Sequence, residues 1–255
     1  PSTAPAAAAT DPGTVQGPAG RTVPVASIRS INDKDGWAGT VVAGALITRG
    51  NSDTDAFNLS FDAARRTAVD RLNVSGQYLF ARQRDEDGGD KTTSTDNWRA
   101  VGKYDRFLSE KLYAFVSLGV EKDRIAGLDL RLTPAVGAGY QWVERPDFNV
   151  NTEAGVAYVY ENYADRASDE NISLRLAYHV DRKVRDGVVV FHNTSFFPSV
   201  ETVSDYYFLT DAGVRADLTD HFFTEFKVEL KYDATPAPDA SRSDLRYILG
   251  VGWSF

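Results

Sequence analysis

The feature that most constrains the fold of this chain is a strict alternation of apolar with polar or small side chains. Between residues 128 and 142, every even-numbered position is apolar, and the odd-numbered positions carry charged, polar or small residues. Successive side chains of a β-strand point to opposite faces, so a period of two predicts strands. The same alternation returns at 171–181, at 222–232 and in the closing LRYILGVGWSF. The sequence therefore indicates an all-β protein.

Twelve segments of this kind can be counted after residue 36. They cover residues 37–48, 55–66, 70–82, 95–107, 111–121, 128–142, 148–161, 171–181, 188–198, 205–217, 222–232 and 243–255. Twelve strands leave roughly 18 residues for each strand with its connection, which is enough for the roughly 9–11 residues that cross a bilayer. Bacterial barrels have an even number of strands, so a misread hairpin would make the number ten or fourteen.

A transmembrane barrel explains the alternation better than a soluble sandwich does. No run approaches the roughly 18 apolar residues that a membrane-spanning helix needs, and 42% of the residues are hydrophobic. A sandwich would bury one whole charged face of many strands in its own core. Short connections such as 144–147 also alternate with longer ones such as 82–95 and 233–243. We therefore predict a transmembrane antiparallel up-and-down β-barrel of about 12 strands.

Residues 1–35 differ in composition from the rest of the chain. Pro, Ala, Gly, Ser and Thr dominate residues 1–30 without any strand or helix period. Such a segment buries too little apolar surface to offset its ordering entropy. We predict an irregular N-terminal tail or docked segment over 1–35 and the barrel over 36–255. The chain has no initiator Met and no charged-then-apolar leader, so we expect that a signal peptide has been removed.

The charge balance and the histidines argue against several functions. A net charge of −8 argues against a nucleic-acid partner. His192 and Ser195 are three apart on a strand and point to opposite faces, so they cannot form a base and nucleophile pair. His179 could pair with Asp181, but no third member can be named. No two histidines have metal-ligand spacing on one helix face. We expect no enzyme activity, no metal and no cofactor.

The polar face of the predicted strands carries nearly equal numbers of acidic and basic residues, which argues against a strongly ion-selective pore. Hairpin geometry lets Arg131 face Glu161 and Asp211 face Lys227, with Arg215 diagonal to Glu225. These charges either satisfy one another across the lumen or line a narrow water-filled pathway, because twelve strands lie between a filled barrel and an open channel. The candidate lumen network comprises Arg99, Glu121, Arg131, Glu153, Glu161, Arg175, Asp211, Arg215, Glu225, Lys227 and Arg246.

Four stretches carry a resemblance to a known family. ITRGNSDTDAFNLSFDAARR at 47–66, FLSEKLY at 107–113, SFFPSV at 195–200 and the closing LRYILGVGWSF together resemble the salt-induced outer-membrane protein family. The terminal Phe255 resembles the signal by which outer-membrane barrels are recognised for assembly. The resemblance covers about 36–255 and implies a bacterial outer-membrane location, contact with lipid and lipopolysaccharide, and use of the barrel assembly machinery. It brings no established biochemical function and no catalytic residues.

Two functions remain open at this point. The first is a structural or partner-binding role in the envelope, with a charge-paired lumen that residues 1–35 could plug and another outer-membrane protein as partner. The alternative is a narrow channel for small polar solutes or ions.

Overall fold

The computed structural model describes residues 14–16, 22–24, 36–48, 53–84, 90–165, 167–202, 204–236 and 241–255. The chain divides into two units, Pro1–Asp35 and Gly36–Phe255. In the first unit, β1 (Thr14–Gln16) pairs antiparallel with β2 (Thr22–Pro24). Among the described residues, no helix is long and apolar enough to cross a membrane.

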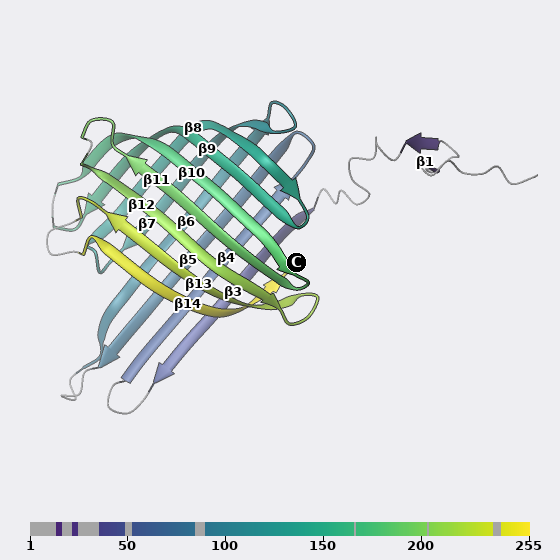
Figure 1. Cartoon of the computed structure of the whole chain (residues 1–255). Coiled ribbons are helices and arrows are strands. Elements are labelled where there is room, and N and C mark those ends of the chain that lie inside the picture. The colour runs from purple at the N-terminus through teal and green to yellow at the C-terminus, as the bar shows by residue number, and fades with distance from the viewer. Residues whose placement is uncertain are drawn as a thin grey trace, which may run out of the picture. The chain divides into compact units, whose positions relative to one another are not determined.

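Twelve antiparallel strands of the second unit form a closed barrel (Figure 1). Each strand pairs with its neighbours in sequence, and the last strand closes onto the first. This confirms the predicted fold class. The strands are β3 (Trp37–Thr48), β4 (Asp53–Arg66), β5 (Asp70–Arg84), β6 (Thr92–Phe107), β7 (Leu112–Asp123), β8 (Leu128–Arg145), β9 (Phe148–Tyr163), β10 (Asp169–Arg185), β11 (Val188–Pro198), β12 (Tyr206–Asp217), β13 (Phe222–Asp233) and β14 (Ser243–Ser254).

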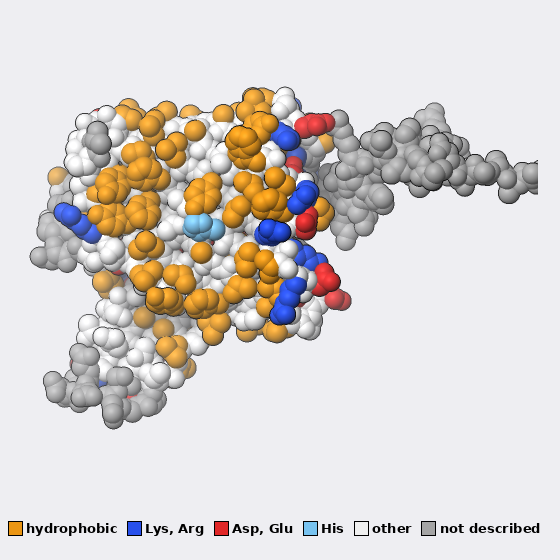
Figure 2. Space-filling view, in the orientation of Figure 1, with side chains coloured by type: hydrophobic (Ala, Val, Ile, Leu, Met, Phe, Trp, Pro, Cys, Tyr) orange, Lys and Arg blue, Asp and Glu red, His pale blue; other side chains and the backbone are white. Residues whose placement is uncertain are grey.

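The apolar side chains of the alternating segments face outward. On β8, the outward-facing Val136 and Trp142 are 59% and 56% exposed, whereas the lumen-facing Arg131 is 2% exposed. Hydrophobic side chains accordingly cover much of the outer face in Figure 2. Leu128, which we expected on this face, is instead buried. The β8–β9 register shifts between Leu128 and Leu130, so the bulge turns Leu128 inward and Asp129 outward.

The two ends of the barrel differ in the length of their connections. At the short-turn end, where β3 begins and β14 ends, the connections are 67–69, 108–111, 146–147, 186–187 and 218–221. At the long-loop end they are 49–52, 85–91, 124–127, 164–168, 199–205 and 234–242. One of these connections, 124–127, is only a short turn between β7 and β8. Gly127 has a φ of 66°, a left-handed conformation that glycine adopts without strain.

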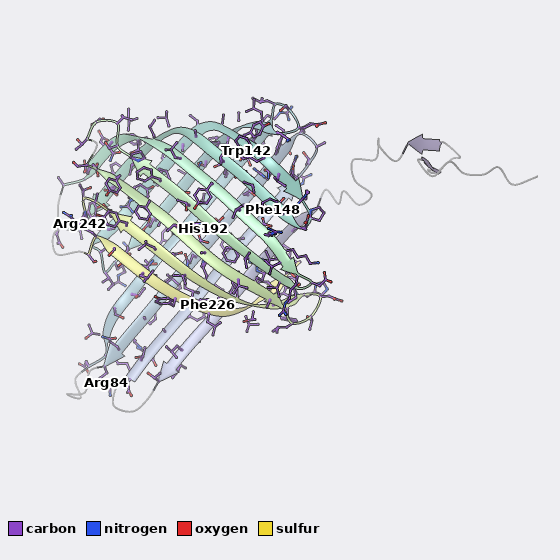
Figure 3. The ribbon with its side chains drawn as sticks, in the orientation of Figure 1. Arg84, Trp142, Phe148, His192, Phe226 and Arg242 are labelled. Atoms are coloured by element: carbon purple, nitrogen blue, oxygen red, sulfur yellow. The ribbon has the colours of Figure 1, made fainter. Side chains whose placement is uncertain are left out.

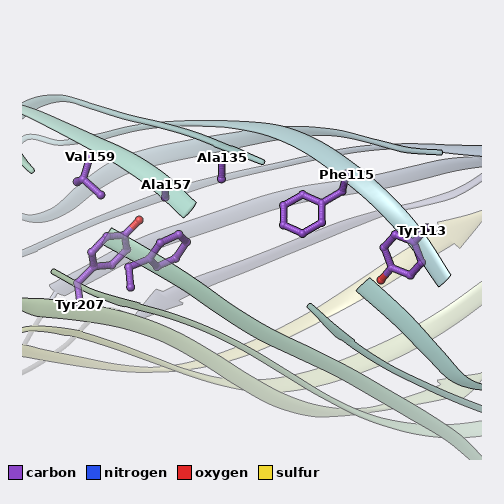
Figure 4. Close-up of a cluster of buried hydrophobic side chains, with 7 residues drawn as sticks. Tyr113, Phe115, Ala135, Ala157, Val159 and Tyr207 are labelled. Carbon is purple, nitrogen blue, oxygen red and sulfur yellow. The ribbon is translucent and has the colours of Figure 1, made fainter. Parts of the chain in front are cut away.

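The interior is less polar than the alternation led us to expect. Tyr113, Phe115, Ala135, Ala157, Val159, Phe197 and Tyr207 form a buried cluster inside the barrel (Figure 4), which we call the aromatic cluster. The rings of Phe197 and Tyr207 stack with centroids 4.5 Å apart. A barrel of this strand number is narrow enough for large side chains from several strands to meet in its lumen.

The seam between β14 and β3 is the shortest pairing in the barrel. Its ladder contains four residue pairs, from Ser254–Thr40 to Val251–Ala43. Every other neighbouring pair of barrel strands has between nine and fourteen. The seam gains two backbone hydrogen bonds at the short-turn end, where Phe255 and Gly39 each donate N–H to the other's carbonyl at 3.1 Å.

Candidate functional site: the charged lumen

The eleven residues that the sequence placed in the lumen all lie on lumen-facing positions. Each of them lines the interior cavity or takes part in an ion pair inside the barrel, or does both. They do not form one continuous set. The structure divides them between a network that crosses the lumen, a second cluster on one wall, and the walls of a cavity.

The first group, which we call the cross-lumen network, joins β6, β7 and β8 to β13 and β14. One guanidinium nitrogen of Arg131 on β8 lies 2.7 Å from the Asp233 carboxylate on β13, and another lies 3.3 Å from Glu121. Arg99 on β6 lies 2.7 Å from Glu229 on β13. We define the network as Arg99, Glu121, Asp123, Arg131, Glu161, Glu229, Lys231, Asp233 and Arg246. At its edge, Lys227 lies 4.0 Å from Glu229 and Asp244 lies 3.4 Å from Arg246.

Arg131 is the most buried cation of this network. Its side chain is 3% exposed and contacts three carboxylates, those of Glu121, Glu161 and Asp233. Its guanidinium also lies 4.7 Å from the centre of the Tyr207 ring, a cation–π contact that links the network to the aromatic cluster. Arg131 is directly opposite Glu161 in the β8–β9 ladder, which confirms the predicted pair.

The other predicted pairing was wrong in its register. Asp211 faces Glu229 rather than Lys227, and Arg215 lies directly opposite Glu225, to which it donates a 2.7 Å hydrogen bond. Lys227 faces Gly213. The prediction centred the turn between β12 and β13 on residue 219, whereas the pair Asp217–Phe223 centres it on residue 220. A shift of one residue in the turn moves every pairing by two positions.

The second cluster lies on the wall formed by β5, β6, β7, β9 and β10. Lys103 contacts both Asp105 and Glu153, and Arg175 lies 2.6 Å from Glu153. Arg71 adds a 2.6 Å contact to Asp105, which is fully buried. Three cations therefore share two carboxylates, which leaves this cluster with a net charge of +1.

A cavity of about 940 Å³ occupies the part of the lumen nearer the short-turn end, where it reaches Ala38 and Phe255. Its lining contains both signs of charge, as the sequence predicted. The charged residues are Asp62, Arg71, Arg99, Lys103, Glu153, Arg175, Asp181, Asp211, Arg215, Glu225 and Lys227. This size is in the range of small-molecule sites.

The three histidines have separate environments. His179 lines the cavity, and its two ring nitrogens share hydrogen bonds with Asp181 and Asn193. Both nitrogens are engaged, so neither is left to accept a proton from a nucleophile. His221 lies in the turn 218–221. Among the residues whose positions are described, no group of three potential ligands could hold a metal ion.

His192 lies on the outer face, amid the hydrophobic surface (Figures 2 and 3). Its nitrogens share hydrogen bonds with the hydroxyls of Tyr178 at 2.9 Å and Thr210 at 3.0 Å. Ser195 lines the cavity instead, so the two residues point to opposite faces as predicted. The partners of His192 come from the neighbouring strands, so the ring is satisfied although it faces outward.

Several aromatic residues ring the short-turn end. Trp37, Trp142 and Trp253 are exposed there near the ends of their strands. The ring of Phe255 stacks on Trp253 with centroids 5.1 Å apart. Aromatic belts of this kind lie at the interfaces of membrane proteins.

The candidate set lacked four members of the cross-lumen network. Glu229 and Lys231 stand on lumen positions of the predicted segment 222–232, and the other two lay outside the predicted segments. Asp123 and Asp233 were assigned to loops, but they end β7 and β13 with their side chains inside. The alternation could have found both, because each continues the odd-numbered lumen positions of its strand.

Comparison with known proteins agrees with the barrel fold. No curated protein matches the chain. The solved NanC porin covers 85% of this chain and 98% of its own at 7% identity and a TM-score of 0.50. The KdgM porin covers 86% and 99% at 10% identity and 0.45. The translocator domain of the autotransporter NalP from Neisseria meningitidis covers 86% and 87% at 13% identity and 0.45.

The comparison of sequences gives one family match. It spans residues 41–255 and its description does not mention salt, so the salt-induced name suggested by the resemblance stays a prediction. Since the match covers most of the chain, this protein belongs to the family described as "Protein of unknown function, DUF481".

Proposed function

We propose that this protein is an integral outer-membrane barrel with a structural or partner-binding role, whose axial passage is closed by the cross-lumen network. The observation that carries the proposal is the set of ion pairs between β6–β8 and β13–β14. The outward hydrophobic surface and the aromatic residues at the short-turn end support the location. In that setting the outer face contacts lipid and lipopolysaccharide, and the barrel assembly machinery reads Phe255.

The closure follows from where the network lies. Two arginines, Arg99 on β6 and Arg131 on β8, contact carboxylates on β13, and Arg246 on β14 contacts Asp123 on β7. The aromatic cluster fills the side of the lumen next to Arg131. Breaking a buried pair costs about 3 kcal/mol or more, which lowers the population of the broken state roughly a hundredfold. An axial path through the cross-lumen network opens only when several of these ion pairs break at the same time, so the open state is rare.

Single-channel recording in planar bilayers tests the closure. We expect no conductance steps from the wild-type protein at any voltage. The double variant Glu229→Gln with Asp233→Asn removes the cross-lumen carboxylates of Arg99 and Arg131, and we expect it to conduct. Asp147→Asn, in the exposed turn 146–147, is the matched control and should stay closed. Regular conductance steps from the wild type would refute the closure.

A second candidate, a narrow channel for small polar solutes or ions, is favoured by the charged cavity alone. In that case the wild type would conduct, and Arg175→Trp, which fills the cavity wall, would reduce the conductance.

The partner role has its own test. A second outer-membrane protein should co-purify with the full chain and be lost when residues 1–35 are deleted. A clean preparation that deletion leaves unchanged would count against this role and against the tail as the partner's contact.

A further inference from the structure

The seam between β14 and β3 separates before it reaches the long-loop end. Its ladder stops at the pair Val251–Ala43. Continued in the same register, it would pair Gly44 with Gly250, Ala45 with Leu249, Leu46 with Ile248 and Ile47 with Tyr247. None of these pairs occurs among the described residues. We call the gap between residues 45–47 of β3 and 247–249 of β14 the seam slit. In Figure 1, β14 and β3 run apart on leaving the short-turn end.

The exposure of the side chains along this gap agrees with the separation. Ile47, Tyr247 and Leu249 are 69%, 69% and 65% exposed, the highest values among the large hydrophobic residues described. Outward-facing residues elsewhere in the barrel are partly covered by the neighbouring strand. Three rows at about 3.4 Å per residue make the slit about 10 Å long.

The slit lies at the level of the hydrocarbon. Leu245, Tyr247, Leu249, Val251 and Trp253 form the outward face of β14 and are all apolar. Inside a bilayer no water reaches the N–H and C=O groups along an unpaired strand edge, so such an edge is strongly disfavoured. Opening the seam therefore costs free energy, and this cost favours the state in which the two edges pair with each other.

The cavity ends close to the slit. Val42 on β3 pairs with Ser60 on β4, and the same row continues through Gln77 on β5 to Arg99 on β6. The last three of these residues line the cavity. Val42 is next to the last row of the seam ladder. Beyond this level, Arg99 enters the cross-lumen network. A molecule in the cavity therefore has the ion pairs of the cross-lumen network next to it along the barrel axis. The β14–β3 seam lies to one side of it.

The lumen side of the seam is apolar or small, unlike the charged lumen side of the neighbouring strand β13. On β3 these positions are Val42, Gly44 and Leu46, and on β14 they are Ile248 and Gly250. Leu46 faces inward and is nevertheless 56% exposed. Gly44 approaches the carbonyl of Leu249 so closely that a Cβ there would clash, so the strands still touch at Gly44 and part immediately after it.

We propose that the β14–β3 seam is a lateral gate for an acyl-chain amphiphile. In the closed state the ladder continues through Ile47 and Tyr247. In the open state an acyl chain enters from the bilayer through the seam slit, along the apolar lumen side, and its polar head lies in the charged cavity. The axial closure proposed above is a separate property, because conductance reports the axial path and acyl-chain labelling reports the lateral one.

The chain contains no cysteine, so a disulfide lock needs no background changes. Ile47→Cys with Tyr247→Cys bridges the slit. Opposed residues of an antiparallel pair have Cα atoms about 4.5–5.5 Å apart, within the range of a disulfide. Val41→Cys with Trp253→Cys bridges an outward-facing row that is already paired and is the matched control.

The probes are a photoactivatable fatty acid and a phospholipid with the same photoactivatable chain, each in proteoliposomes. The fatty acid reports entry of a free acid and the phospholipid reports entry of a membrane lipid. Labelled residues are mapped by mass spectrometry. We expect at least one probe to label the lumen-facing Ser60 and Gln77 in the unlocked protein. Oxidation should reduce this label at least fivefold in the 47/247 variant and leave it unchanged in the 41/253 variant, and a thiol reductant should restore it.

Three results would overturn the proposal. The first is that neither probe labels lumen-facing residues of the unlocked protein. The second is that the 47/247 disulfide does not change the amount of label. The third is that the 47/247 pair forms no disulfide while the 41/253 pair does. The last result would mean that the seam does not close in this register.

Discussion

Replacing Arg131 by alanine removes the most buried cation of the cross-lumen network. The side chain is almost completely buried and is the cation nearest to Glu161 and Asp233. Glu121 keeps a second cation in Lys231. The substitution therefore leaves two carboxylates inside the barrel without their nearby positive charge, and it also removes the contact with the Tyr207 ring.

The expected loss of stability is about 4 kcal/mol. Removing one partner of a buried ion pair costs roughly 3–5 kcal/mol because the other charge stays uncompensated, and a cation–π contact adds about 1 kcal/mol. These contributions do not add fully, because Glu161 also accepts a hydrogen bond from the Tyr163 hydroxyl at 2.9 Å. The control Arg145→Ala removes an exposed pair with Asp147 and should cost about 1 kcal/mol or less.

The assay is urea unfolding in lipid vesicles, followed by the fluorescence of the four tryptophans, which gives the free energy of unfolding. Adding Asp233→Asn to Arg131→Ala should recover part of the loss, since it removes one of the stranded charges. If Arg131→Ala costs no more than Arg145→Ala, the guanidinium is not desolvated and the reasoning for a closed lumen fails.

Three other substitutions test separate parts of the structure. Gly137→Ala should cost about 1–3 kcal/mol, because its Cβ would meet Gly155 and Phe115 on either side, whereas Gly102→Ala meets nothing within 4 Å and should be neutral; equal costs in urea unfolding would contradict this. Val136→Arg, at the outward middle of β8, should cost about 2–4 kcal/mol in bilayers, and Ile125→Arg in the turn 124–127 almost nothing; a neutral Val136→Arg would argue against lipid contact. Deleting Phe255 removes its two hydrogen bonds with Gly39 and should lower the folded, heat-modifiable fraction on gels; an unchanged fraction would contradict a role in closure or assembly.

The architecture of the barrel was accessible from the sequence because the alternation repeats in every strand. All twelve predicted segments coincide with strands. Their ends differ by up to four residues, because β5, β7 and β9 extend toward the long-loop end and β8 and β10 extend toward the short-turn end. The sequence did not reveal the strand register where a bulge or a turn contains one residue more than expected. The bulge beside Leu128 reverses the two faces locally, and the turn centred on residue 220 exchanges the partners of Asp211.

The lumen was predictable in its members and not in its contacts. Alternation identifies which side chains point inward, so Arg131, Arg175 and Glu225 were found. It does not say which residues meet across the barrel, because Arg99 and Glu229 are 130 positions apart in the chain and their contact depends on the closed geometry. The aromatic cluster was missed for a related reason. Tyr113 and Tyr207 stand on the same inward positions as the charges, and only the narrowness of the barrel makes them a packed core.

The alternation of lipid-facing and lumen-facing residues is the central claim, and a spin-label scan of β8 tests it most directly. Single cysteines are introduced in turn at positions 130 to 142 of this cysteine-free chain, labelled with a nitroxide and measured in bilayers for collisions with molecular oxygen. We predict high oxygen accessibility at every even-numbered position, and low accessibility at every odd-numbered one. A period of 3.6 residues, or high accessibility at the odd-numbered positions, would contradict the barrel's placement in the membrane.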